Sequence, residues 1–457
     1  MGRVARDPPD ADELVGLVDL DPPYDFYLAT LMSALSFDQR RDLEALDRRA
    51  LERLQLEKLN RLLALVRAKN HFYERKLAGC PPTLTSLDEL ASLPLTIKDE
   101  LQPEGGETFA ANRTYEIEAY TRFHETSGTH GRPLAVLDTA EDWQWWNGCW
   151  QFVLDAAEIT PSDRALLAFS FGPFVGFWSA FDALVSRGTM AIPGGGMGSL
   201  ARIELLRKSE ATALFCTPTY ALRLAEVAAE HKIDLTSLAV EKIVVAGEPG
   251  GSVPAFRGRI EAAWDATVID HAGATEVGPW GFADAEGRGL HVNESEFVAE
   301  FVSVETGRAA QDGELAQLIL TTLGRGGAPV IRYRTGDLVR PTWTASGPNR
   351  FVLLEGGVLG RIDDMLIIRG VNVFPSAIEQ ILHGFPEVVE YRLTARKRGE
   401  LDEVLVEVED HLGEPRRIEQ ELQVRLGLKI DVQGVPPASL PRFEGKGRRF
   451  VDERRRS

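Results

Sequence analysis

Hydrophobic positions divide the chain into regions with different periodicities. Leucines recur at helical spacing within residues 38–70, and residues 204–231 show a second helical pattern. Short apolar runs, which are typical of buried strands, lie at residues 165–169, 212–216, 242–246 and 267–270. Alternation of helices with short buried strands favours βαβ units around a parallel sheet.

The pattern changes after residue 296. A smaller, mostly antiparallel β region is predicted at residues 297–304, 315–321 and 337–341. After Gly360 we expect strands at residues 365–368 and 404–408 and helices at residues 376–383 and 418–427. The sequence therefore predicts an α/β protein. Residues 1–360 would form a large N-terminal domain of parallel and mixed sheets with helices and a β subdomain, and residues 361–457 a small α+β domain.

Size and composition support this division and exclude some partners. A chain of 457 residues suits two or three domains, and a hydrophobic content of 44% is normal for a globular protein. The net charge of −18 argues against a nucleic-acid partner. The three cysteines lack the spacing of a zinc site, and the N-terminus lacks the apolar segment of a secretory signal. These features favour a reduced, cytoplasmic protein.

Residues 165–181 are uncharged and rich in apolar side chains. They fall short of the ~20 residues that a membrane-spanning helix needs, and Gly172, Pro173 and Gly176 interrupt them. We interpret the segment as a buried strand with a glycine-rich turn, and expect no membrane partner.

One segment has more charged and turn-forming residues than a core strand needs. Residues 360–376 join Arg361, Asp363 and Asp364 to an apolar run and then to an Asn-Val-Phe-Pro turn. A hinge that carries charged groups into and out of a site would need such a pattern. Three further motifs lie at residues 126–133 (TSGTHGRP), 273–279 (GATEVGP) and 333–337 (YRTGD).

In this order and at these spacings, the motifs closely resemble those of the adenylate-forming superfamily of acyl-CoA synthetases and adenylation domains. A closer similarity to the phenylacetate–CoA ligase branch is carried by residues 216–222 (CTPTYAL), 331–337 (IRYRTGD) and 441–446 (PRFEGK). The similarity runs from about Pro94 to about Asp452. It implies that the small C-terminal domain is mobile, and that ATP, Mg²⁺ and CoA are used.

The glycine- and hydroxyl-rich motif at residues 126–133 is not the usual phosphate-binding loop, because no lysine follows its second glycine. The resemblance implies a mobile loop that holds the β- and γ-phosphates of ATP. Its binding residues would be Ser127, Gly128, Thr129, His130, Gly131 and Arg132. Taken alone, the segment is better explained as an ordinary hairpin or loop, and the other motifs reverse that preference. His130 replaces a hydroxyl residue usual in the family, so it either hydrogen-bonds phosphate or alters the handling of pyrophosphate.

The GATEVGP motif follows a predicted strand. The resemblance implies that Thr275 contacts the α-phosphate and that Glu276 coordinates Mg²⁺, so both would be catalytic. A single glutamate is chemically reasonable, because Mg²⁺ takes one or two carboxylates together with phosphate oxygens. In isolation, Glu276 would be a solvated loop residue. Ala272 stands where the family commonly has an aromatic residue, so the site is either roomier there or partly covered by His271.

Asp337 matches the family aspartate that accepts hydrogen bonds from both ribose hydroxyls. A carboxylate suits this role because it offers two acceptor oxygens and no donor. The resemblance implies that Arg361 assists it from the hinge motif. It also implies that Gly247, Glu248 and Pro249 flank the adenine.

Lys446 matches the C-terminal lysine of the family, whose ammonium bridges carboxylate and α-phosphate oxygens as charge moves to pyrophosphate. In a basic tail, a lysine is otherwise a solvated charge. Asp363 is the implied hinge between two positions of the small domain. In the second position, the loop with Arg369, Gly370 and Asn372 would line the tunnel for the pantetheine arm of CoA.

Two aromatic- and glycine-rich segments resemble those that line the acyl pocket of the phenylacetate–CoA ligase branch. Their pocket residues would be Phe171, Phe174, Gly195 and Gly196. Aromatic rings and glycines suit a flat, apolar acid, although plain core packing explains any single phenylalanine equally well.

These features predict an AMP-forming acid–thiol ligase. It would activate a carboxylic acid, aryl or arylacetyl by preference, to acyl-AMP and transfer the acyl group to CoA, releasing AMP and pyrophosphate. One alternative is a stand-alone adenylating enzyme that loads a carrier-protein thiol or an amine. Another is a non-catalytic, nucleotide-binding regulatory protein, for which His130 and Ala272 are the support. A homodimer is the commonest default for the oligomeric state.

Overall fold

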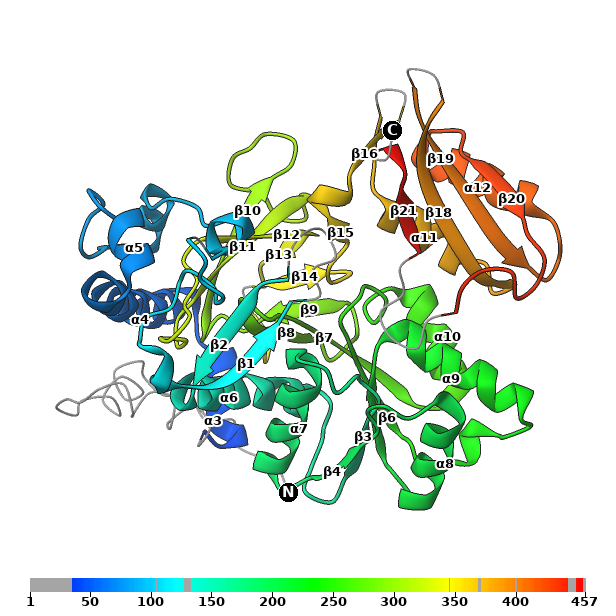
Figure 1. The fold of residues 1–457 in the computed structure, drawn as a ribbon, viewed down its shortest axis with the longest axis horizontal. Coiled ribbons are helices and arrows are strands. Elements are labelled where there is room, and N and C mark those ends of the chain that lie inside the picture. The colour runs from blue at the N-terminus through cyan, green and yellow to red at the C-terminus, as the bar shows by residue number, and fades with distance from the viewer. Residues whose placement is uncertain are drawn as a thin grey trace.

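The computed structural model describes residues 35–103, 105–126, 133–344, 346–368, 371–398, 401–442 and 449–454. These residues form a large α/β lobe and a smaller lobe near the C-terminal end, drawn in orange to red in Figure 1. The predicted fold class is therefore confirmed. Every helix in these ranges is too short or too polar to traverse a lipid bilayer.

A nine-stranded sheet forms the centre of the large lobe. Its strands are β3 (Arg164–Leu167), β4 (Met190–Pro193), β5 (Ala213–Cys216), β6 (Lys242–Ala246), β7 (Thr267–Ala274), β8 (Gly278–Ala283), β9 (Gly289–Val292), β13 (Pro341–Thr342) and β14 (Leu353–Glu355). Across the sheet they follow the order β13-β14-β9-β8-β7-β6-β5-β3-β4. Pairing is parallel from β4 to β7 and antiparallel from β7 to β13. The predicted parallel sheet is thus one half of a mixed sheet.

Helices cover both faces of the parallel half. They are α6 (Ala140–Ala156), α7 (Val175–Arg187), α8 (Ser199–Ser209), α9 (Pro218–Glu230) and α10 (Pro254–Trp264). Alternate residues of β5 face opposite sides of the sheet and pack into two different hydrophobic cores. Ala213 and Phe215 pack in the core that contains α6 and α7, whereas Leu214 and Cys216 pack with α8, α9 and α10. A strand buried on both faces is continuously apolar, which explains the short runs in the sequence.

The helical pattern over residues 204–231 covers parts of two helices, and the apolar run predicted as a strand at residues 212–216 is β5, which separates them. Helix α8 ends where Glu210 adopts a left-handed conformation with φ 48°. Helix α9 begins at Pro218, and the hydroxyl of Thr217 caps it by accepting from the Tyr220 amide. Pro at the first helical position and Thr at the N-cap are both favoured there.

The single helix predicted over residues 38–70 is wrong. The structure contains two helices, α3 (Phe37–Glu44) and α4 (Arg48–Lys69). Asp47 separates them, since its carboxylate accepts a hydrogen bond from the Ala50 amide at 2.8 Å and so caps α4.

A four-stranded antiparallel sheet confirms the predicted β region. Its strands, in order, are β10 (Phe297–Ser303), β11 (Ala316–Thr322), β12 (Tyr333–Val339) and β15 (Gly360–Arg361). A separate antiparallel pair consists of β1 (Tyr120–Glu125) and β2 (Ala135–Thr139). The short helices of the large lobe are α5 (His71–Lys76), η2 (Leu87–Ser92), η3 (Lys98–Leu101), η4 (Ile117–Ala119) and η5 (Leu235–Ser237).

The small lobe has its own sheet and its own hydrophobic core. Its elements are η6 (Ile362–Asp364), the hairpin β16 (Leu366–Ile368) and β17 (Val371–Val373), α11 (Pro375–His383), β18 (Val388–Arg398), β19 (Leu401–Asp410), α12 (Pro415–Leu426), β20 (Asp431–Gly434) and β21 (Phe450–Asp452). The sheet order is β20-β19-β18-β21. Ile378, Leu393, Val406 and Ile418 are among the fully buried side chains of this core. The strands and helices predicted here are confirmed, but β18 was not predicted.

Three elements of the large lobe are joined by a buried charge cluster. Asp155, on α6, accepts from Nε and Nη2 of Arg40 on α3 at 2.6 and 2.9 Å. Arg187, on α7, donates to the same carboxylate at 2.5 Å. Removing one member of such a cluster leaves buried charge without compensation.

We expect Asp155→Ala to lower the free energy of unfolding by about 3–5 kcal/mol, because two arginines lose their carboxylate. Denaturant unfolding followed by tryptophan fluorescence measures the change. The control is Glu204→Ala, which removes an exposed ion pair with Arg207 on α8 and should cost about 0–1 kcal/mol. A loss no larger than that of the control would contradict this account.

Candidate active site

Several predicted site segments meet at one edge of the parallel sheet. Gly195 lies just beyond β4, Gly247 follows β6, and Ala272 lies near the end of β7. The carboxyl ends of parallel strands share one edge, where α/β sheets bind their ligands. In the β6–β7 pair, Ala246 lies opposite His271. The segment expected to flank adenine is therefore a neighbour of the segment expected to contact phosphate.

The chain reverses between β7 and β8, and this turn carries Thr275 and Glu276. The register shifts beside Gly273, where a Cβ would lie 3.0 Å from the Gly278 carbonyl oxygen. Gly278 has φ 126°, and a Cβ there would lie 2.7 Å from the Trp145 ring. Both motif glycines are thus required by the geometry of the turn.

Glu276 points toward the β12 strand of the second sheet. The Tyr333 hydroxyl donates to Glu276 Oε1 at 2.8 Å, and the Lys98 ammonium lies 3.4 Å from the same oxygen. The glutamate side chain is 11% exposed. Burial, reinforced by the Glu276 charge, raises the pKa of Tyr333 well above its usual value, so this hydroxyl remains a donor. Sequence reasoning missed Lys98, and it quoted Tyr333 without assigning it a role.

Asp337 and Arg361 lie opposite each other on paired strands β12 and β15. Arg361 Nη1 donates to Asp337 Oδ1 at 3.0 Å, and its Nη2 lies 3.5 Å from Asp363. Tyr333 shares strand β12 with Asp337, so one strand contacts both Glu276 and Arg361. The structure therefore brings Glu276, Asp337 and Arg361 into one neighbourhood, as the resemblance implied.

Some predicted residues lie outside the described ranges: the loop residues Ser127, Gly128, Thr129, His130, Gly131 and Arg132, together with Arg369, Gly370 and Lys446. The described residues on the two sides of residues 127–132 are held together. Thr126 and Leu134 are linked by hydrogen bonds of 3.1 Å between backbones and 2.9 Å from the Leu134 amide to the Thr126 hydroxyl. Asn372 lies on strand β17 of the small lobe.

The residues on either side of Lys446 are anchored by arginine–carboxylate pairs. Arg442 donates to both oxygens of Glu409 at 2.7 and 3.1 Å. Arg449 donates to both oxygens of Glu390 at 2.5 and 2.9 Å. Both carboxylates belong to the small-lobe sheet, Glu409 on β19 and Glu390 on β18.

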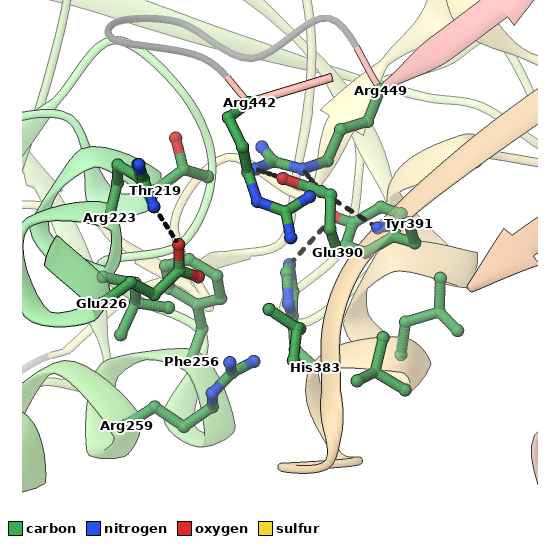
Figure 2. Close-up of a pocket in the computed structure, with 14 residues that line it drawn as sticks. Thr219, Arg223, Glu226, Phe256, Arg259, His383, Glu390, Tyr391, Arg442 and Arg449 are labelled. Atoms are coloured by element: carbon green, nitrogen blue, oxygen red, sulfur yellow. Dashed lines mark hydrogen bonds and ion pairs between the residues drawn. The ribbon is translucent and has the colours of Figure 1, made fainter. Parts of the chain in front are cut away.

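The two lobes meet at a cavity beside these pairs, which Figure 2 shows. Phe256 of α10 packs edge-on against His383 of α11, with ring centroids 4.3 Å apart. The Tyr391 hydroxyl lies 3.3 Å from His383 Nε2. Burial, together with the charges of Arg259 and Arg449, lowers the pKa of His383 to about 3. The histidine is therefore neutral at the seam between the lobes.

The predicted acyl-pocket residues are partly brought together. The Phe171 ring lies over Gly195, where a Cβ would fall 2.5 Å from Phe171 Cδ2, and it is 3.8 Å from the Cβ position of Gly196. Phe174 instead lies against Gly172. Both phenylalanines are more than 40% exposed, which a plain core role does not explain. The adjoining Pro173 carbonyl accepts from the Glu125 amide at 2.7 Å, which links this segment to strand β1.

The remaining predicted residues belong to the segments expected to lie beside adenine. Glu248 Oε1 accepts from the Thr219 amide at 2.9 Å, while Gly247 and Pro249 are exposed. His271 is buried against Trp150, and burial lowers its pKa to about 4. It therefore covers little of the surface beside Ala272.

Glu276 is the carboxylate predicted to hold a metal ion. Across the described ranges, no group of three or more His, Cys, Asp or Glu side chains could hold one. A lone carboxylate fits Mg²⁺, because phosphate oxygens and water complete its coordination. It would not suit a zinc ion, which needs several protein ligands.

Comparison with known proteins identifies the architecture. A family model described as AMP-binding enzyme matches residues 119–298, and one described as AMP-binding enzyme C-terminal domain matches residues 370–454. The matched parts include the Thr275–Glu276 turn and most of the small lobe. Fold and site thus define an adenylate-forming enzyme.

Full-length relatives narrow the class. The chain is 32% identical over 450 residues to phenylacetate-coenzyme A ligase of Thermus thermophilus, covering 91% of this chain and 99% of the relative. It is 32% identical over 425 residues to the ligase of the same name from Escherichia coli, covering 88% and 95%. The chain belongs to the phenylacetate–CoA ligase family. It is an AMP-forming acid–CoA ligase.

Solved structures indicate how the lobes are arranged. The postadenylation state of 2-hydroxyisobutyryl-CoA ligase matches with a TM-score of 0.85 at 26% identity, over 92% of this chain and 94% of that one. The thioesterification state of the same enzyme covers the same shares at 27% identity but scores 0.69. The lobe arrangement in Figure 1 is therefore closer to the postadenylation state.

A buried carboxyl group lies one residue before His271. Asp270 accepts from the Ser252 hydroxyl at 2.5 Å. Burial raises its pKa from 3.8 to about 6. Between these two pH values the native protein binds more protons at this group than the unfolded chain does, so the stability contribution of Asp270 falls as pH rises.

We expect Asp270→Asn to flatten the fall in stability between pH 4 and about 6.5, because the amide cannot ionise but still accepts from Ser252. Thermal unfolding of wild type and variant over this range measures the difference. Asp265→Asn, in the exposed turn after α10, is the control and should leave the pH profile unchanged. Parallel profiles for wild type and Asp270→Asn would contradict the assignment.

Proposed function

We propose that this enzyme converts an aryl or arylacetyl acid, ATP and CoA into the acyl-CoA thioester, AMP and pyrophosphate. The acid carboxylate attacks the α-phosphorus of ATP and pyrophosphate leaves. The sulfur of CoA then attacks the acyl carbonyl and AMP leaves. Such a reaction needs positioning and charge stabilisation more than covalent participation of the protein.

The observation that carries the proposal is the convergence of Thr275, Glu276, Asp337 and Arg361 through Tyr333 at the carboxyl edge of the sheet. Thr275 would contact the α-phosphate and Asp337 the ribose hydroxyls. Gly247 to Pro249 would flank the adenine, which fits their place beside Ala272. The 127–132 loop would hold the β- and γ-phosphates.

Glu276 would hold Mg²⁺, which on binding would neutralise charge on the phosphates. Tyr333 and Lys98 both approach Oε1 of this glutamate. Their shared contact orients the carboxylate toward the site. The hydrogen bond from Tyr333 leaves the second oxygen for the ion.

The acid class rests on the aromatic segment at residues 171–178. Phe171 packs edge-on with Phe177 at 4.7 Å between centroids, and Trp178 lies 6.2 Å from Phe171. A half-exposed ring over Gly195 can form a flat wall for an aromatic acid. Phenylacetate-coenzyme A ligases among the relatives support the same class.

The small lobe, proposed as residues 361–457, would serve the two steps in turn. Lys446 would act in the first, and the loop with Arg369, Gly370 and Asn372 in the second. Asp363 would be the hinge, which its 61% exposed side chain supports. The two scores against the ligase captured in different states support such a movement.

Pyrophosphate exchange into ATP tests the function directly. We expect exchange that depends on an aryl or arylacetyl acid, and little exchange with straight-chain acids. Release of AMP should then require CoA. Release with a carrier protein but not with CoA would favour the alternative acceptor, and exchange with no acid at all would refute the proposal.

Lys446→Ala should reduce acid-dependent pyrophosphate exchange by about 100-fold or more, because a charge opposite the developing pyrophosphate is lost. Thioester formation from supplied acyl-AMP and CoA should remain near wild type. Lys429→Ala, on the exposed surface after α12, is the control. An equal loss of both half-reactions would show that the division of labour is wrong.

Asp363→Pro should give the reverse result. Proline fixes φ and restricts the preceding residue, so the lobe should stay in its first position. Exchange should persist while thioester formation from acyl-AMP falls by about tenfold or more. Asp364→Ala, next to the hinge, is the comparison variant. Undiminished overall turnover in Asp363→Pro would exclude residue 363 as the hinge.

A further inference from the structure

A fully buried arginine lies beneath the Thr275–Glu276 turn. Arg325 follows β11 and is 0% exposed. Its Nε and Nη2 lie 2.8 and 2.7 Å from Oδ1 of Asp138 on β2. Its third nitrogen, Nη1, donates to the backbone carbonyl of Thr275 at 3.0 Å. One side chain thus bonds to two segments that are far apart in the sequence.

The surroundings hold this guanidinium in place. It lies 5.4 Å from the Trp146 ring, and the Trp146 indole donates to Asp138 at 3.2 Å. Gly324, the preceding residue, is pressed against Trp145, where a Cβ would fall 2.3 Å from the ring. Burial alone would raise the pKa of Asp138, but Arg325 and His124 hold it below its usual value. The carboxylate and guanidinium therefore form a charged pair inside the lobe.

The two segments joined by Arg325 border the two halves of the expected triphosphate site. Asp138 lies on β2, the strand that follows the predicted motif at residues 126–133, and Arg325 ties this strand to the Thr275 turn. The ion pair with Asp138 would be complete without the third hydrogen bond. A planar guanidinium can satisfy both partners at once, which the single ammonium of a lysine cannot do.

We propose that Arg325 is a positioning residue for the adenylation step, which fixes the Thr275–Glu276 turn relative to strand β2. This proposal rests on the proposed function and goes beyond that function, because Arg325 lies outside every motif used to assign the site. The arginine touches no substrate. Its effect falls on ATP, whose phosphates span both segments, and much less on acyl-AMP, which lacks the β- and γ-phosphates.

The decisive experiment separates positioning from stability. Arg325→Met alone should lower Tm, because the buried Asp138 carboxylate loses its guanidinium. The double variant Arg325→Met with Asp138→Leu replaces the whole pair by apolar side chains, which is often neutral for stability. We expect its Tm to return to near wild type while the Thr275 contact stays lost.

In that double variant, acid-dependent pyrophosphate exchange should fall roughly tenfold to a hundredfold, with KM for ATP raised. Thioester formation from supplied acyl-AMP and CoA should stay within about threefold of wild type. Arg325→Lys should keep more of the Tm than Arg325→Met but show the same rise in KM for ATP. If the double variant does not fold, the KM for ATP of Arg325→Lys distinguishes a positioning role from a purely structural one.

Arg187→Met is the matched control, since Arg187 also bonds to a buried carboxylate and to a backbone carbonyl, that of Ile159. It should lower Tm without changing KM for ATP. Recovery of exchange together with Tm in the double variant, or equal losses in both half-reactions, would overturn the proposal. If wild type itself showed no acid-dependent exchange, the proposed function would fail instead, which is a distinguishable result.

Discussion

The reversal of strand direction between β7 and β8 is the constraint on which the site depends. The neighbouring parallel strands are followed by crossover helices, which carry the chain away from the carboxyl edge. At β7 the chain turns back at once, so Thr275 and Glu276 remain at that edge. Gly278 makes this possible, because its positive φ and its contact with Trp145 leave no room for a side chain. The second sheet then supplies Tyr333 to the same place.

The pattern of apolar positions predicted most elements around this edge, and its errors have physical reasons. Leucine spacing is the same within one helix and across two, so it could not reveal that Asp47 begins a new helix. Helical periodicity over residues 204–231 likewise could not show where α8 ends and α9 begins, although the apolar run at residues 212–216 predicted β5. Strand β18 was missed because charged side chains alternate along it, two of them paired with glutamates of β19. Helix caps and cross-strand pairs determine where these helices begin and whether this strand forms. The spacing of apolar residues carries no information about them.

The proximity of predicted site residues could be anticipated from sequence where their contacts are local to a motif. Thr275 and Glu276 share one turn, and Asp337 meets Arg361 across a single strand pair. The partners Lys98 and Arg325 come from distant segments, and only the folded chain brings them to the turn. Nothing in their own sequence neighbourhoods distinguishes them from ordinary surface or core cations. Family motifs therefore identify the residues expected to contact ligand. The residues that hold these in position can be identified only from the folded structure.

The arginine–glutamate pairs on the two sides of residues 443–448 have a consequence for which residues of the small lobe can be changed. Arg442 and Arg449 each form a bidentate pair with a glutamate on a strand of the small lobe. Such charge-assisted pairs fix both the position and the orientation of the arginine side chain. The entry and exit points of the segment are therefore set by the scaffold and not by the residues between them. Residues between the two anchors, other than Lys446, could therefore be replaced by design without rebuilding the strands that hold the anchors.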